Sequence, residues 1–349
     1  MDVQSQELHY VNQFIKPLFF LFIISQLLAP ALAHVNWFVG TEVINTVEPF
    51  RLAEHHVQIA LILFCVALLM AWLLDRVISI FYRPSAMQWK NQHSVLRFAQ
   101  ILVGIALFYS AIKSAFFAPH FSGTDSIPWL ALCIEALVGV LLIAGKWVRA
   151  SALVMLVLYV YLGAVFGFVS FLEYLNYAGL AVVFMVFHED ADERTQQVAL
   201  TVFRVSLGVA LITLGLSEKI TDPELAMSFL QQYEQINFMK MLGFNFSDRL
   251  FVLSSGLAEA LFGAVFILGI VTRINTVVLA MFLIASNSYF FIIGQEDLAM
   301  MELLGHTPLF ACAILLVALG KGANTCELYV YVSNIQVALS RRLNVNRAH

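Results

Sequence analysis

The chain alternates long apolar runs with short polar breaks, and these runs predict its elements. Ten runs lie between the breaks, at residues 17–33, 57–82, 95–117, 128–145, 150–169, 172–187, 199–217, 250–271, 274–294 and 304–320. Most are close to the roughly 20 residues that an α-helix needs to cross about 30 Å of hydrocarbon. We therefore expect an all-α polytopic membrane protein with about ten transmembrane helices.

The composition shows that much of the surface of this chain must contact lipid and not water. Hydrophobic residues are 61% of the 349 residues and charged residues 12%, with a mean hydropathy of +0.84. Soluble domains carry about 25% charged residues. The net charge is only −4 and no basic cluster occurs, which excludes nucleic acid as an expected partner.

Lysine and arginine fall mainly on one side of the predicted spans. With a cytoplasmic N-terminus, the inner segments hold Arg76, Arg83, Lys90, Arg97, Lys146, Arg149, Arg194, Arg204, Arg273, Lys321, Arg341 and Arg342. The outer segments hold Arg51, Lys219, Lys240 and Arg249, with Lys113 near a span end. The positive-inside rule then predicts that both termini lie in the cytoplasm. We expect the protein in a bacterial inner membrane.

The first span has two interpretations. Residues 17–33 end in Ala31-Leu32-Ala33, which has the form of a signal-peptidase site. The segment is either retained as a signal-anchor helix or cleaved, and cleavage would leave His34 as the new N-terminus. Both alternatives place the downstream chain in the same orientation.

An internal repeat divides the rest of the chain. Glu135, Gly139, Gly145 and Arg149 recur 124 residues later as Glu259, Gly263, Gly269 and Arg273. Each stretch also starts at an arginine, Arg97 or Arg204, and continues to a lysine, Lys113 or Lys219. We expect an N-terminal two-helix hairpin (1–94), two four-helix blocks (95–190 and 199–322) and a cytoplasmic amphipathic tail (323–349).

The paired glutamates are candidates for function. A carboxylate within a span normally faces the bundle interior or a wet cavity, and Glu135 and Glu259 each have a glycine four residues later that permits close helix approach. One interpretation is a structural hydrogen bond to a neighbouring helix or to the lysine of the same block. The other is a ligand or proton site.

These residues resemble the DoxX-like membrane family. The second block carries the resemblance best, through Arg204, Gly208, Gly215 and Lys219, then Glu259, Gly263, Gly269 and Arg273, then Glu302 and Gly305. The first block lacks the glycine four residues after its arginine, although Gly104 lies nearby. The resemblance covers roughly residues 95–320 and leaves residues 1–94 outside it.

The resemblance implies a four-helix bundle per block and a link to redox biology. It suggests a subunit of a membrane oxidoreductase, or a partner of a periplasmic or membrane redox protein, with a bound quinone as one option. Whether this chain is itself an enzyme stays open. The alternatives are a transporter of a small solute or metal, because repeats around buried carboxylates recur in transporters, and a non-catalytic membrane scaffold for a partner protein.

Histidines cluster at the outer ends of the first two spans. His34 follows the first span, and Glu54, His55 and His56 open the second. Imidazole and carboxylate groups suit transition metals, so we expect copper first and zinc second; the alternative is a set of interfacial histidines. Glu302 and His306 form a second, weaker pair one helical turn apart.

Overall fold

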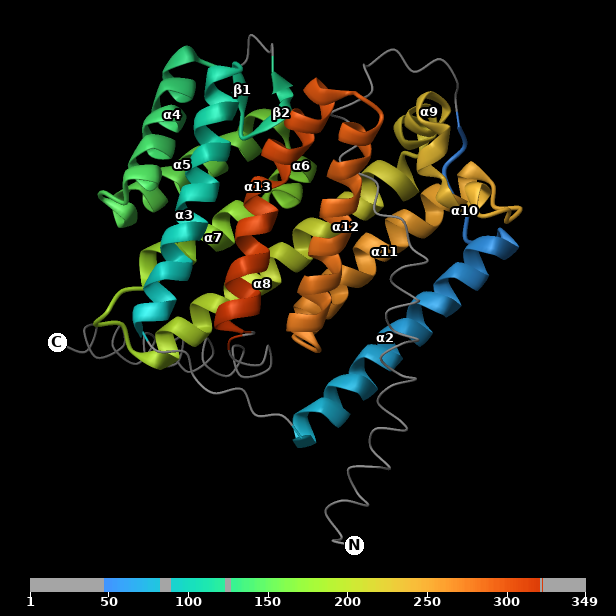
Figure 1. Cartoon of the computed structure of the whole chain (residues 1–349), viewed down its shortest axis with the longest axis horizontal. Helices are drawn as coiled ribbons and strands as arrows, with labels where there is room; N and C mark the ends of the chain where they lie inside the picture. Colours follow the sequence, from blue (N-terminus) through green and yellow to red (C-terminus); the bar gives the residue numbers. More distant parts are fainter. Residues whose placement is uncertain (1–46, 82–88, 123–126, 321, 323–349) are drawn as a thin grey trace, which may run out of the picture.

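The computed structural model describes residues 47–81, 89–122, 127–320 and 322, and within them the chain is a helical bundle with one short hairpin (Figure 1). The helices and strands are α2 (His55–Phe81), α3 (Trp89–Ile112), β1 (Ala115–Phe116), β2 (Ala118–Ser122), α4 (Trp129–Ala144), α5 (Val148–Phe166), α6 (Phe168–Glu173), α7 (Leu175–Val186), α8 (Glu193–Gly215), η2 (Leu216–Thr221), α9 (Glu224–Gln232), η3 (Glu234–Ile236), α10 (Phe238–Met241), α11 (Asp248–Leu268), α12 (Thr272–Ile292) and α13 (Glu296–Leu319). The strands β1 and β2 pair antiparallel.

The described part has the helices of an integral membrane protein. Seven helices within it are long and apolar enough to cross a bilayer: His55–Ser79, Asn91–Ile112, Val148–Phe166, Glu193–Thr221, Asp248–Leu268, Thr272–Ile292 and Glu296–Leu319. Two shorter apolar helices, α4 and α7, fall where spans were also expected. The expected first span, 17–33, and the tail, 323–349, lie outside the described residues, so the total of ten stays a prediction.

Two elements differ from the apolar pattern. The run 172–187 was expected as one helix, but α6 ends at Glu173 and α7 begins at Leu175, with Tyr174 between them. The run 95–117 also ends early as a helix, because α3 stops at Ile112 and the hairpin follows. Single polar residues stand at both breaks, Lys113 and Ser114 after α3 and Glu173 at the end of α6, but hydropathy averaged over a run gives no stop signal there.

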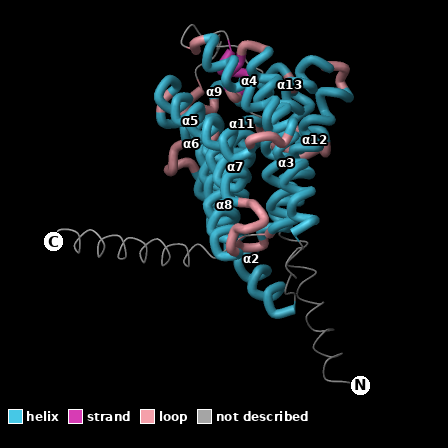
Figure 2. The backbone as a smooth tube through the Cα atoms, turned by 90° about the vertical axis from the view of Figure 1, so that its left-hand side faces the viewer, coloured by secondary structure: helices cyan, strands magenta, loops and turns pink. Residues whose placement is uncertain are grey.

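Helices pack both against sequence neighbours and against helices far along the chain. α3 packs against α4 and also against α13, which follows it by about 200 residues, while α8 packs against α11 and α7. α5 contacts α7 and α12 contacts α13. Figures 1 and 2 show α13 beside α3 and α7 beside α8, so the stretches 95–190 and 199–320 pack against each other along these two helix pairs. α2 packs against α11.

Glycines bring two helix pairs into direct backbone contact. A Cβ added to Gly104 of α3 would lie 2.6 Å from the Gly139 carbonyl oxygen of α4. A Cβ added to Gly208 of α8 would lie 2.6 Å from the Gly263 carbonyl oxygen of α11. Such close approach is typical of helix pairs in membranes, where small residues permit tight van der Waals packing.

Candidate functional site: a buried polar layer

Several acidic side chains are buried in the interior of the bundle. Five glutamates, one lysine and one histidine have at most 9% of their surface exposed: Glu135, Glu173, Glu218, Glu259, Glu302, Lys219 and His306. We call these seven residues the buried polar layer. Charged groups in a membrane interior are costly unless paired or neutral, so their individual partners decide what the layer can do.

In the second stretch, Glu259 of α11 is held by a lysine. Both carboxylate oxygens lie 2.6 Å from Lys219 Nζ, and the lysine is fully buried. Lys219 belongs to η2, a π-helical turn that continues α8. A π-helical turn adds a residue per hydrogen-bonded ring and often marks a functional position, and this one carries both Glu218 and Lys219 into the interior.

In the first stretch, Glu135 of α4 has a different partner. Its Oε1 accepts a hydrogen bond of 2.9 Å from the backbone N–H of Phe117, and its buried Oε2 has no hydrogen-bond partner among the described residues. Lys113 lies exposed after the end of α3, 5.7 Å from the ring centroid of Tyr109. The expected correspondence of Lys113 with Lys219 therefore fails, because α3 ends at Ile112 and the hairpin supplies a backbone N–H instead.

Arg97 and Arg204 hold the far ends of α4 and α11. The Arg97 guanidinium donates to the carbonyls of Leu142 and Ile143, and Arg204 donates to those of Phe266 and Ile267. The accepting carbonyls belong to the last turn of each helix, where no intrahelical N–H is available. Both arginines are therefore structural caps in the described structure.

On α13, Glu302 is fully buried and adjoins His306. Its Oε1 lies 3.8 Å from His306 Nδ1, beyond hydrogen-bond range, and neither carboxylate oxygen has a hydrogen-bond partner among the described residues. His306 Nδ1 instead lies 3.1 Å from the side-chain nitrogen of Asn287 on α12. The sequence pair Glu302 and His306 is thus brought together, with Asn287 as a third member that the sequence did not suggest.

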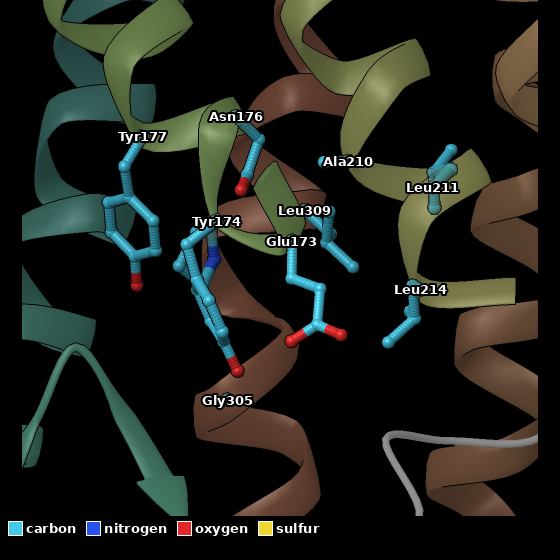
Figure 3. A pocket seen from close by; sticks show the side chains of 10 residues that line it. Glu173, Tyr174, Asn176, Tyr177, Ala210, Leu211, Leu214, Gly305 and Leu309 are labelled. Carbon is cyan, nitrogen blue, oxygen red and sulfur yellow. The ribbon is translucent and has the colours of Figure 1, made fainter. Parts of the chain in front are cut away.

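A small pocket opens beside these groups where α7, α8 and α13 meet. It is lined by Glu173, Tyr174, Asn176, Tyr177, Ala210, Leu211, Leu214, Gly305, Pro308 and Leu309. Figure 3 shows the Glu173 carboxylate between Leu214 of α8 and Gly305 of α13, and Ser217 donates a 2.6 Å hydrogen bond to it. The volume is about 30 Å³, enough for one or two water-sized molecules and too small for a quinone ring.

The expected metal ligands lie outside this layer. Glu54 Oε2 is 2.9 Å from His56 Nε2, and Arg249 of α11 approaches both Glu54 oxygens at 3.1 and 3.3 Å. The Arg51 backbone N–H and the Arg249 guanidinium hold the pKa of the Glu54 carboxyl below its usual range. His55 is exposed, and His34 lies outside the described residues. Within the described ranges, no three His, Cys, Asp or Glu side chains are grouped to hold a metal ion.

Several residues of the site were not predicted from the sequence. Glu173 starts an apolar run, and Glu218 adjoins Lys219; a search for every carboxylate inside or beside an apolar run would have found both. Asn287 and Arg249 gave no such signal, because polar residues of these types are common at span ends and in outer loops.

No family model, no curated protein and no solved structure matches the chain.

Proposed function

We propose that this integral membrane protein exchanges a small cation for protons through the buried polar layer. The observation that carries the proposal is the state of Glu135 and Glu302, which are both fully buried within helices and neither of which contacts a lysine or arginine in the described structure. A carboxylate in this environment must take up a proton or bind a cation, since an unpaired buried charge costs several kcal/mol.

The arrangement of the helices is compatible with transport. Parallel repeats related by an axis along the membrane normal occur in known transporters, and the two stretches pack against each other through α3 with α13 and α7 with α8. The pocket at the junction of α7, α8 and α13 supplies a carboxylate, two tyrosines and an asparagine. Acidic and hydroxyl groups of this kind suit a small cation better than an anion.

Flux through proteoliposomes tests the proposal. The purified protein would be reconstituted with a pH-sensitive dye inside the vesicles, and Na⁺, K⁺ or Li⁺ added outside. We expect at least one of these cations to drive internal alkalinisation as protons leave, and Glu302→Gln to reduce the rate by about 100-fold, the scale of a lost proton-transfer group.

Glu296→Gln is the matched control, because Glu296 is exposed in the first turn of the same helix. It should transport at the rate of the unmodified protein. Vesicles in which none of the three cations moves protons would contradict the proposal.

A DoxX-like, redox-associated role is the second candidate, as a subunit or partner of a membrane oxidoreductase in the bacterial inner membrane. It is favoured by the residues that carry the resemblance, which contact one another in both stretches: Arg97 and Arg204 reach corresponding carbonyls, and the pairs Gly104–Gly139 and Gly208–Gly263 touch in the same way. In this role a metal, or a quinone in another conformation of the bundle, would bind near the outer face.

A redox-associated role with a bound metal can be tested directly through the histidines at the start of α2. The purified protein is loaded with copper or zinc, dialysed and analysed for bound metal, with His55→Ala/His56→Ala as the variant. If the outer hairpin is a metal site, the parent retains stoichiometric metal, copper before zinc, and the double variant loses most of it. Equal metal content in the two proteins, or none in either, would exclude the site.

A further inference from the structure

We infer that Glu302 and His306 form a proton-exchange pair on α13, in which Glu302 carries a proton in the resting protein and His306 is its acceptor. As a carrier of transported protons the pair rests on the proposed function, but its protonation can be measured without any transport.

The protonation of Glu302 follows from its surroundings. Its side chain has no exposed surface, and neither oxygen has a hydrogen-bond partner among the described residues. A carboxylate accepts hydrogen bonds at both oxygens when ionised, and burying the ion without them costs several kcal/mol. The neutral acid is therefore the form that this site stabilises, and its O–H hydrogen is free to move.

His306 is prepared to receive that hydrogen. Asn287 places its side-chain nitrogen 3.1 Å from His306 Nδ1, so an amide N–H donated there leaves Nδ1 as an acceptor, in the neutral imidazole. Asn287 Oδ1 is buried and has no hydrogen-bond partner among the described residues. The same amide nitrogen also donates to the Leu283 carbonyl, which keeps the nitrogen on the His306 side. A proton that arrives at Nδ1 therefore replaces the hydrogen bond from Asn287, because that ring nitrogen has a single lone pair.

The step itself moves one proton and needs no other reactant. The Glu302 O–H bond breaks as an N–H bond forms at His306 Nδ1, leaving a carboxylate beside an imidazolium. Oε1 and Nδ1 are 3.8 Å apart, so a small rotation of either side chain brings them within hydrogen-bond distance. The resulting ion pair is compact, and release of the proton from His306 completes the exchange.

No other charged group competes for this proton in the described structure. α13 packs against α3, α7, α8, α12 and β2, whose described titratable or charged side chains are His93, Arg97, Tyr109, Tyr177, Glu193, Arg194, Arg204, Arg273, Tyr289 and His120. None of them hydrogen-bonds Glu302. Ser286 of α12 is the uncharged polar side chain that faces it.

The helix beyond the pair connects it to the pocket. Gly305, Pro308 and Leu309 line the pocket on the α13 side, and Gly305 directly precedes His306. Pro308 has no N–H to donate to the carbonyl of Leu304, which leaves a polar backbone group at this turn. The pocket that Gly305 lines also holds Glu173, Tyr174 and Tyr177, and a carboxylate is a group that can take up a proton leaving His306.

Infrared spectroscopy of the reconstituted protein tests both halves of the inference. The carbonyl stretch of a protonated carboxylic acid is separate from the bands of carboxylates. We expect such a band at neutral pH, one component of which is lost in Glu302→Gln and retained in Glu296→Gln. In D2O the same component should shift as its proton exchanges, and His306→Gln should slow that exchange by about 100-fold.

A band that Glu302→Gln leaves unchanged would overturn the protonation of Glu302. Exchange in His306→Gln at the rate of the unmodified protein would overturn the pairing, and this measurement uses intact Glu302, so it does not depend on the folding of the first variant. If the band behaves as expected while no cation moves protons in proteoliposomes, the proposed function fails and the proton-exchange pair stands.

Discussion

Replacing Lys219 with methionine is expected to lower the free energy of unfolding by about 3–5 kcal/mol, because it leaves a buried carboxylate without its partner. Glu259 has 4% of its surface exposed and both of its oxygens contact Lys219 Nζ. The double variant Lys219→Met/Glu259→Leu removes both charges and should recover most of the loss, since a buried ion pair can often be replaced by apolar residues of similar volume.

Unfolding in detergent, followed by far-ultraviolet circular dichroism against denaturant, gives the comparison. Lys113→Met is the matched control, because Lys113 is the exposed lysine of the first stretch and surface substitutions usually stay within about 0.5 kcal/mol. If Lys219→Met unfolds at the same denaturant concentration as the parent, the ion pair does not stabilise the fold.

Gly208→Ala is expected to destabilise the bundle by about 1–3 kcal/mol through overpacking between α8 and α11. The added Cβ would lie 2.6 Å from the Gly263 carbonyl oxygen and 2.8 Å from Ile267 Cγ1, and two helix backbones cannot separate at one point without loosening the contacts around it. The same loss should appear for Gly104→Ala, which meets Gly139 and Ile143 at matching distances.

Ser288→Thr adds a single methyl group on an exposed part of α12 and serves as the control. Its stability should match that of the parent protein in the same denaturant series. Retention of full stability in both glycine variants would show that the helix pairs can move apart at little cost.

The apolar pattern predicted the positions of the helices well in the described residues, because a bilayer imposes one length and one composition on every span. The pattern could not show that α6 and α7 separate at Tyr174 or that α3 ends at Ile112. The hairpin after α3 is held by the hydrogen bond that Phe117 donates to Glu135. Polar residues stand at both breaks, but single polar residues also occur inside helices such as α11 and α13, so they do not by themselves mark a helix end.

The candidate site was predicted less completely than the helices. Glu259 with Lys219 and Glu302 with His306 were paired in advance by spacing along one helix or within one block, and the structure brings both pairs together. Lys113 has the same place in the sequence pattern as Lys219 but lies exposed. Equal spacing gives equal geometry only while the helix continues, and α3 does not continue to Lys113.

The interlocked helices have a consequence for how the protein is made. α3 leaves the ribosome long before α13, its later partner. A membrane insertion machinery that releases helices in order would leave the face of α3 that α13 covers in contact with lipid until synthesis is almost complete. Glu302 and His306 arrive on that last helix, so the proton-exchange pair is assembled at the end of biogenesis. A truncated chain that stops before residue 296 would lack both the pair and the cover of α3, and quality-control proteases should remove it.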